Sequence, residues 1–311
     1  MIVAEQLGKT FDEFVAVHEV SLDVAPGEVL ALLGPNGAGK TTTIRMLTAI
    51  LKPTRGRASV AGYDVVQRPD AVRRVVGVLT EHHGLYTRSQ GDEYLDFFGE
   101  MYGLSKAVRR QRSATLLERF GLADAAKRRI GEYSKGMRQK LSLIRAMLHD
   151  PAALLLDEPT SAMDPESAKQ VRDAILELRR DHRTVILSTH NLNEAELLAD
   201  KIAIIRKGRI VASGSPAELK QRLMGPAEME LRLAQPLNGV VKDLHGLVTV
   251  RAVGEQWLRY TSGQPEVDNP QVLAKLAGLG VPVVTLSEVP RSLESVYLQI
   301  MGAQATEEAT R

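Results

Sequence analysis

The sequence predicts an α/β fold with a mostly parallel central sheet, a helical insertion and a smaller α+β unit near the C-terminus. Three observations lead to this prediction. A glycine-rich turn joins the apolar run at residues 29–33 to a helix-like stretch. Two further runs, 153–156 and 184–187, are apolar on both faces, as are strands inside a parallel sheet covered by helices. Between residues 91 and 150 the apolar residues recur at helical spacing instead.

Composition and charge narrow the class of protein. The 311 residues are enough for two domains, and 44% hydrophobic and 25% charged residues are typical of a globular protein. The formal net charge is only +2, so we expect no nucleic-acid partner. The absence of cysteine excludes disulfides and thiolate zinc sites, and it fits a reducing compartment.

Membrane-directed segments are not apparent in the sequence. No N-terminal stretch combines a basic region, an apolar core and a small-residue cleavage site. No apolar run approaches the roughly 18 to 20 residues that span a bilayer. We therefore expect a cytoplasmic protein, and any membrane-spanning part must come from a partner.

The elements of the first half follow from local patterns. Residues 1–24 contain short alternating segments that suit antiparallel strands. The turn Pro26-Gly27 precedes the strand at 29–33, and a helix is expected at 42–51. Residues 58–60 and 75–79 are predicted as further strands. A helical subdomain is then expected over about 87–150, where Tyr94, Leu95 and Phe98 begin the helical spacing.

Helices at 166–180 and 192–199 are expected to cover the strands at 153–156 and 184–187. A hairpin follows at 202–205 and 209–211, and then a helix at 216–223. Gly225-Pro226 marks the predicted boundary between a domain at 1–224 and an accessory domain at 225–302, with a flexible tail at 303–311.

The accessory domain has the pattern β-α-β-β-α-β, which is typical of a small ferredoxin-like fold. Its strands are expected at 229–233, 248–253, 257–261 and 281–286, and its helices at 238–244 and 270–279. A last helix is expected at 293–300.

A phosphate-binding loop follows the strand at 29–33. Glycines let backbone N–H groups turn inward, and the N-terminus of the next helix adds its positive dipole end. Lys40 is expected to reach the β- and γ-phosphates of ATP and the Thr41 hydroxyl to ligate Mg²⁺, and Thr42 is also expected to bind ATP. The pattern G-x-x-x-x-G-K-T is formed by Gly34, Pro35, Asn36, Gly37, Ala38, Gly39, Lys40 and Thr41.

Two carboxylates, Asp157 and Glu158, follow the apolar run at 153–156. Parallel strands bring their carboxyl ends to one edge of a sheet, so these acids can face the phosphate loop. We expect Asp157 to hold Mg²⁺ through its shell and Glu158 to polarise the attacking water. The alternative is a pair of surface acids at a strand end.

The segment Y-S-K-G-M-R-Q-K at 133–140 resembles the signature motif of the ATP-binding-cassette (ABC) family, and the match covers residues 1 to about 223. By itself, the start of this segment would be an ordinary helix cap. The resemblance implies instead a second anion site that completes ATP across a dimer, so a second ATP-binding subunit is expected, as a homodimer. Its residues are Ser134, Lys135, Gly136 and Met137.

The resemblance implies further roles. Asp164 closes a loop, S-A-M-D, that couples the two sites of the dimer, and His190 matches the switch histidine that contacts the γ-phosphate. Phe11 occupies the place of the ring that stacks on adenine, with Phe14 as the alternative. Glu81 replaces the usual glutamine, which ligates Mg²⁺ and senses the transmembrane partner.

Two features resemble the exporter branch of the family: the form Y-S-x-G-M of the signature and the run S-L-E-S-V-Y-L at 292–298. They imply an ATPase that drives a separate integral-membrane permease from the cytoplasmic face of the cell membrane. An importer subunit is one alternative. A soluble cassette ATPase acting on DNA or ribosomes is another, although single copies of each motif and the lack of heptads disfavour it.

Overall fold

The computed structural model describes residues 1–80, 84–161, 163–224, 226–237 and 239–289, together with residues 294 and 297. The chain divides into two compact units, Met1–Pro216 and Ala217–Arg311. Helix α8 (Pro216–Met224) occupies the residues between this division and the boundary that the sequence predicts after residue 224. Within the described ranges, no helix has the length and apolar character needed to cross a membrane.

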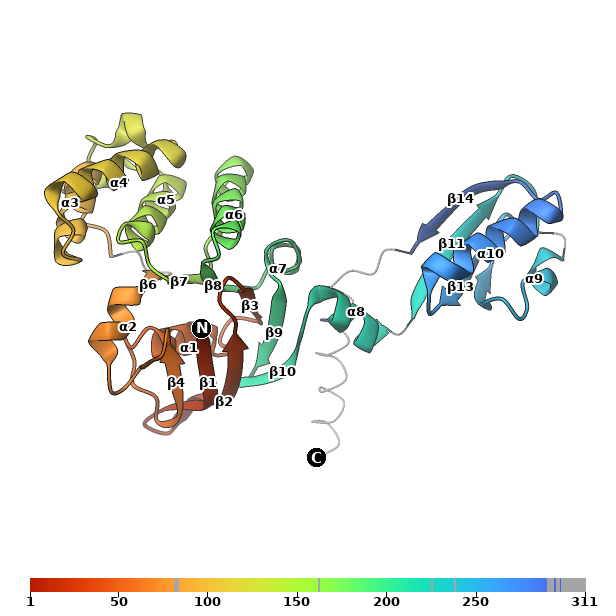
Figure 1. Cartoon of the computed structure of the whole chain (residues 1–311), viewed down its shortest axis with the longest axis horizontal. Coiled ribbons are helices and arrows are strands. Elements are labelled where there is room, and N and C mark those ends of the chain that lie inside the picture. The colour runs from red at the N-terminus through yellow and green to blue at the C-terminus, as the bar shows by residue number, and fades with distance from the viewer. Residues whose placement is uncertain are drawn as a thin grey trace. The chain divides into compact units, whose positions relative to one another are not determined.

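The first unit is built on a ten-stranded sheet in the order β5-β4-β1-β2-β10-β9-β3-β8-β7-β6 (Figure 1). Strands β9, β3, β8, β7 and β6 lie side by side in this order, and each pair of neighbours is parallel. Strands β2, β1, β4 and β5 also follow one another, and their neighbouring pairs are antiparallel. The strands are β1 (Ile2–Phe11), β2 (Phe14–Val24), β3 (Val29–Leu33), β4 (Arg55–Val60), β5 (Tyr63–Asp64), β6 (Val76–Leu79), β7 (Ala153–Asp157), β8 (Thr184–Thr189), β9 (Lys201–Arg206) and β10 (Arg209–Gly214).

The parallel strands are buried on both faces. Leu30 and Leu32 of β3 belong to the same apolar cluster as Ile44 and Leu47 of helix α1 (Lys40–Leu47). The residues of β3 that alternate with them are buried too, so the other face of the sheet must also be covered. Helices α6 (Pro165–Arg180) and α7 (Leu192–Leu198) pack on strands β8 and β3. The predicted α/β class is therefore confirmed.

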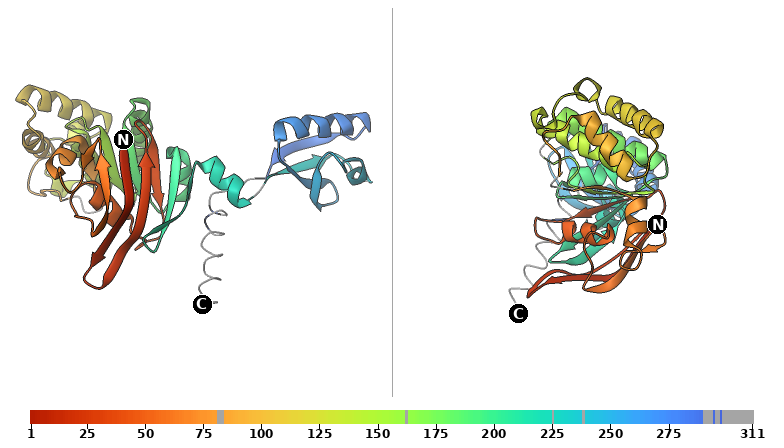
Figure 2. Two further views of the ribbon diagram at one scale, coloured as in Figure 1. Left: turned by 60° about the horizontal axis from the view of Figure 1, so that its bottom comes forward. Right: turned by 90° about the vertical axis from the view of Figure 1, so that its left-hand side faces the viewer.

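The predicted helical insertion is also present. Helices α3 (Gly91–Met101), α4 (Lys106–Arg119) and α5 (Lys135–Met147) gather into one group beside the sheet (Figure 2). Two short 3₁₀ turns, η1 (Ala123–Ala125) and η2 (Ile130–Glu132), connect α4 to α5. Gln90 and Glu93 form a capping box at the start of α3.

Two local expectations in the first unit were wrong. Helix α1 ends at Leu47 instead of continuing to residue 51, because Ala49 takes a left-handed φ of 54° that cannot continue a helix. Helix α2 (Pro69–Val75) had no counterpart in the expected elements. It spans only seven residues, which is too short for a clear helical period in the sequence.

The second unit has the predicted β-α-β-β-α-β order, and its antiparallel sheet runs β12-β13-β11-β14. That spatial order is the ferredoxin-like one, with the first and third strands at the centre. Leu231, Leu258 and Tyr260 of the central strands pack against Val272 and Leu276 of α10. The elements are β11 (Ala227–Leu233), α9 (Val240–Asp243), β12 (Thr249–Val253), β13 (Trp257–Ser262), α10 (Pro265–Gly278) and β14 (Val283–Glu288).

Helix α10 begins at Pro265, five residues before the expected start. Pro265 occupies the first turn, where a missing N–H costs nothing, and Glu266 and Asp268 interact favourably with the helix dipole there.

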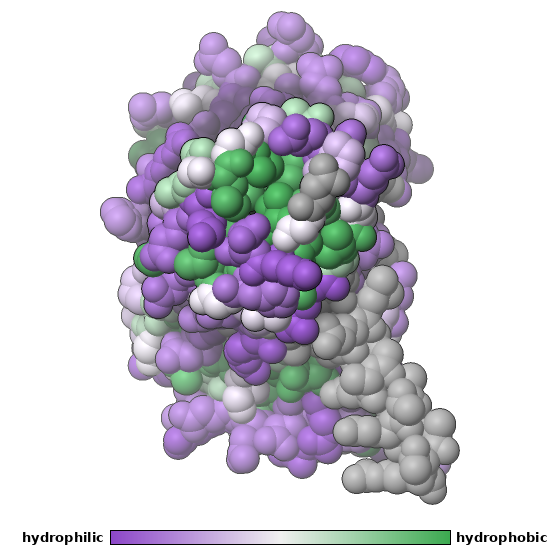
Figure 3. All heavy atoms as spheres, turned by 90° about the vertical axis from the view of Figure 1, so that its right-hand side faces the viewer, coloured by the Kyte–Doolittle hydropathy of each residue, from purple (hydrophilic) through white to green (hydrophobic). Residues whose placement is uncertain are grey.

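Figure 3 shows apolar surface bordered by polar atoms on the side where this unit is seen. Its exposed large apolar residues are Leu247, Val253, Val267, Leu273, Leu279 and Val284.

Candidate nucleotide-binding site

The phosphate loop connects the buried strand β3 to helix α1. Gly37 and Gly39 have φ angles of 78° and 104°, in the region that favours glycine. At Gly34 a Cβ atom would lie 2.3 Å from the backbone oxygen of Ile205, so a larger residue cannot fit. The loop therefore needs glycine at these positions for steric reasons, which explains why its spacing is readable in the sequence.

Lys40 begins α1 and is only 6% exposed. Its ammonium group donates hydrogen bonds to the backbone oxygens of Gly34, at 2.7 Å, and Pro35, at 3.2 Å. It also lies 3.6 Å from Oε1 of Glu158. The loop thus holds the lysine charge at the carboxyl end of β3, where the sequence predicts the phosphates of ATP.

The two predicted carboxylates lie at the carboxyl end of β7, which pairs in parallel with β8. Asp157 is 1% exposed, and the hydroxyl of Ser188 on β8 donates to its Oδ1. The backbone N–H of Glu158 in turn donates to Ser188 Oγ at 3.1 Å. Ser188 therefore contacts both acids. The sequence could have indicated this residue, because it directly follows the apolar run 184–187.

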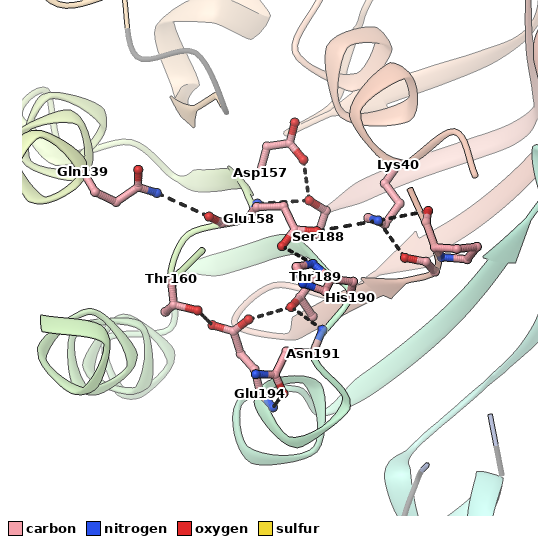
Figure 4. A network of polar contacts seen from close by, with 12 residues as sticks. Lys40, Gln139, Asp157, Glu158, Thr160, Ser188, Thr189, His190, Asn191 and Glu194 are labelled. Atoms are coloured by element: carbon pink, nitrogen blue, oxygen red, sulfur yellow. Dashed lines mark hydrogen bonds and ion pairs between the residues drawn. The ribbon is translucent and has the colours of Figure 1, made fainter. Parts of the chain in front are cut away.

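Glu158 joins the phosphate loop to the predicted switch histidine (Figure 4). Its Oε2 lies 2.9 Å from Nδ1 of His190, which follows β8, and its Oε1 faces Lys40. Oε1 is buried and has no hydrogen-bond partner among the described residues. The carboxylate is thus held on one side and keeps an acceptor on the other. That arrangement suits a group that must accept a hydrogen bond from a water molecule.

A hollow of about 430 Å³ lies over the phosphate loop. Phe14 lines it and Phe11 does not, whereas the ring that stacks on adenine stays a prediction. The Phe11 ring is 43% exposed and has the ammonium group of Lys9 at 5.0 Å from its centroid. The hollow is lined by Phe14, Ala16, Pro35, Asn36, Gly37, Ala38, Gly39, Lys40, Thr41, Thr42 and Glu158.

The signature residues lie elsewhere in the same chain. Ser134 caps α5 by accepting a hydrogen bond from the N–H of Met137, and Lys135 is exposed. Gly136 packs near Asp164: a Cβ atom there would lie 3.5 Å from the Asp164 carboxylate. Hydrogen bonds from Ser167 hold the pKa of Asp164 below its usual value. None of these residues lines the hollow.

The residues present fit a magnesium ion. Oδ2 of Asp157 is buried and has no hydrogen-bond partner in the described part of the chain, whereas its other oxygen is occupied by Ser188. Thr41 lies in the lining of the hollow. Carboxylate and hydroxyl oxygens are the donors that Mg²⁺ prefers. Glu81, the third predicted ligand, and Ala162, two residues before Asp164, lie outside the described residues.

Two sets of contacts were missed by the sequence reasoning. The Gln139 side chain, on α5, donates to the backbone oxygens of Glu158, at 3.3 Å, and Pro159, at 2.9 Å. Glu194, on α7, accepts hydrogen bonds from the hydroxyls of Thr160 and Thr189. Both side chains are polar but buried, and only the tertiary structure shows that they are.

The comparisons with known proteins agree with this geometry. The family model described as ABC transporter matches residues 17–161. The chain is 38% identical to the daunorubicin/doxorubicin resistance ATP-binding protein of Streptomyces peucetius over 98% of this chain and 93% of that protein.

Two solved structures share the fold of the first unit. An ATP-binding subunit of an ABC transporter matches with a TM-score of 0.68 and 30% identity over 72% of this chain and 94% of that chain. A dimeric bacterial ABC transporter cassette matches with a TM-score of 0.65 and 24% identity over 69% of this chain and 98% of that chain.

Proposed function

The chain belongs to the family of ABC transporter ATP-binding proteins, and from this premise we propose that it is the ATPase subunit of an exporter. It hydrolyses ATP and drives a separate membrane partner. The observation that carries the assignment of the site is the line of contacts from Lys40 through Glu158 to His190 beside the phosphate loop.

The proposed reaction uses these groups in place. The N–H groups of the loop and the Lys40 ammonium bind the β- and γ-phosphates. Oε1 of Glu158 lies 3.6 Å from the Lys40 ammonium and has no hydrogen-bond partner among the described residues, and it accepts a hydrogen bond from the attacking water and orients it. The water oxygen attacks the γ-phosphorus and gives a proton to the Glu158 carboxylate, the bond to the bridging oxygen breaks, and ADP leaves with that electron pair. His190 holds Glu158 through Nδ1, and its other ring nitrogen would contact the γ-phosphate.

Thr41 and Asp157 are the groups of this chain that would hold Mg²⁺. The ion would neutralise charge on the phosphate oxygens. The role of Ser188 is then to keep the free oxygen of Asp157 directed toward the site, since its hydroxyl occupies the other one.

A second copy of the chain would complete the site. Ser134, Lys135, Gly136 and Met137 lie at the start of α5, where Ser134 and Lys135 are exposed, and all four are absent from the lining of the hollow. Two copies arranged head to tail with two-fold symmetry would each present this helix start to the other's γ-phosphate. Asp164, beside Gly136, would couple the two sites.

The membrane partner is proposed to dock on the helical group. Tyr86, Phe97, Met101 and Tyr102 are exposed there, and such apolar surfaces commonly mark protein interfaces. The drug-resistance role of the Streptomyces relative supports an exporter over an importer or a soluble ATPase. The chain would then act at the cytoplasmic face of the membrane, with the Glu81 loop sensing the partner.

Glu158→Gln tests the assignment directly. The amide keeps the shape of the side chain but cannot act as a base, so turnover should fall by about 10²- to 10⁴-fold while ATP binding persists. ATP should then trap a dimer, visible by size-exclusion chromatography. Glu118→Gln, an exposed acid on α4, is the control and should behave as wild type. Near-normal turnover of Glu158→Gln would rule out this residue as the base.

A further inference from the structure

A buried acid lies behind the proposed catalytic residues. Glu194 is 4% exposed and lies in the first turn of α7. Its own backbone N–H donates to the Asn191 side chain, which caps this helix. Burying a carboxylate costs free energy unless it is hydrogen-bonded, so the Glu194 carboxylate needs its hydrogen-bond partners.

Those partners come from the loop after Glu158 and from the end of strand β8 (Figure 4). The hydroxyl of Thr160 donates to Oε1 of Glu194 at 2.5 Å, and the hydroxyl of Thr189 donates to Oε2 at 2.6 Å. Thr160 lies two residues after Glu158, and Thr189 directly precedes His190. Thr189 Oγ1 also accepts a hydrogen bond from the N–H of Asn191 at 3.0 Å. The threonine is therefore held on both sides of its hydroxyl.

His190 depends on such anchoring because packing does little to hold it. Its side chain is 57% exposed, whereas the Glu158 side chain that it contacts is 15% exposed. A ring in this position keeps its orientation only if the backbone that carries it is fixed. Pairing with Leu33 of β3 holds Thr189 in the sheet, and its hydrogen bond to Glu194 ties this strand end to α7. The hydrogen bond from Thr160 ties the loop that follows Glu158 to the same carboxylate.

We propose that Glu194 is a positioning residue that joins the switch histidine and the loop after Glu158 into one unit. Its two carboxylate oxygens set the distance between His190 and Glu158, and with it the 2.9 Å contact between them. Glu194 contacts neither phosphate nor water in this role. The inference rests on the proposed function of Glu158 and His190.

Steady-state kinetics of Glu194→Ala test the proposal. Because the phosphate loop is untouched, the KM for ATP should stay within about twofold of wild type, whereas kcat should fall by roughly 10- to 100-fold as the histidine is misplaced. Asn193→Ala, at the neighbouring exposed position of α7, is the matched control and should retain wild-type kcat. A loss that appeared in KM alone would contradict a positioning role.

The decisive measurement is a double-mutant cycle with His190→Ala, followed as single turnovers with enzyme in excess. If Glu194 acts through the histidine, adding Glu194→Ala to His190→Ala should lower the single-turnover rate by less than about twofold. A full additional loss would overturn the proposal. The proposed function itself fails if wild type hydrolyses no ATP, or if Glu158→Gln hydrolyses ATP as fast as wild type. This result differs from a failure of the Glu194 proposal, in which wild type is active and Glu158→Gln is not.

Thr189 provides a second route in case Glu194→Ala does not fold. Thr189→Val removes the hydroxyl with little change of shape, and Thr189→Ser keeps it. We expect kcat to fall by roughly tenfold in the first variant and to stay near wild type in the second. Equal rates for the two variants would show that the hydroxyl, and hence its link to Glu194, does not position the histidine.

Discussion

At the scale of single residues, several charged groups of the candidate site are buried and hydrogen-bonded. Lys40, Asp157 and Glu194 are all nine-tenths or more buried, and each has defined hydrogen-bond partners. His149 is a contrasting case outside the site. Its ring stacks on Tyr102, with centroids 3.8 Å apart and an interplanar angle of 5°, and burial lowers its pKa to about 4.

This shift predicts a pH-dependent stability. Between pH 6.5 and about 4 the unfolded chain protonates His149 while the folded chain does not. The stability linked to the neutral ring is therefore complete above pH 6.5 and is lost as the pH falls toward 4. The loss should approach about 2 kcal/mol after allowance for partial exposure to solvent.

Urea denaturation at pH 7 and pH 4.5 measures the effect. His149→Phe keeps the stacking on Tyr102 and removes the titration, so its free energy of unfolding should fall less between the two pH values than that of wild type. His245→Gln, an exposed position in the second unit, is the control. Identical pH dependence in wild type and His149→Phe would show that this ring is not responsible.

At the scale of elements, helix α5 is tied to the loop that carries Glu158. Gln139 is 5% exposed and satisfies two backbone oxygens of that loop. The same helix begins with the signature residues. Hydrogen bonds therefore connect the helix that begins with the signature residues to the loop that carries Glu158 in the same chain.

Gln139→Leu should break this connection. The substitution keeps the approximate size of the side chain but leaves the oxygens of Glu158 and Pro159 without their donor, at a cost of about 1 to 3 kcal/mol. Chemical denaturation of the variant measures the loss, with Gln111→Leu, exposed on α4, as the control. A variant as stable as wild type would mean that water replaces the glutamine.

The exposed apolar residues of α3 predict a separate property of the helical group. Phe97→Ser combined with Met101→Ser should leave the ATPase activity of the isolated chain within about twofold of wild type, because neither residue lines the hollow. Copurification with a membrane permease should be lost. Ile50→Ser, which alters an exposed apolar residue outside this group, is the control. Retained copurification of the double variant would place the partner elsewhere.

At the scale of the whole molecule, the nucleotide site lies within the first compact unit. Every residue that lines the hollow precedes the division after Pro216, and the second unit has an apolar core of its own. Units of one chain that each have their own apolar core can in principle fold separately.

A chain shortened to residues 1–224 should therefore bind ATP as the full chain does. Its dissociation constant for ATP, measured by titration calorimetry, is expected to stay within about threefold of the full-length value. This corresponds to a difference of under about 1 kcal/mol in binding free energy. Residues 226–289 alone should give a cooperative thermal transition. Loss of ATP binding in the shorter chain would mean that the site depends on the second unit.

Local sequence patterns were enough for the class of fold and the phosphate loop. The β-α-β-β-α-β order of the second unit was also predictable, because strand and helix periods are short-range properties. The bounds of α1 and α10 and the existence of α2 were not, since they depend on single backbone angles and on short elements. The roles of the predicted site residues remain predictions for the experiments above.

By itself, the sequence determined which residues could bind phosphate and supply carboxylates, because glycine spacing and acids after apolar strands reflect local steric and electrostatic needs. Only the tertiary structure decided that Phe14 and not Phe11 lines the hollow. It alone placed Glu194 between Thr160 and Thr189, which lie 34 and 5 residues away along the chain. Such contacts are set by how strands and helices pack, and no local pattern records which side chains that packing brings together.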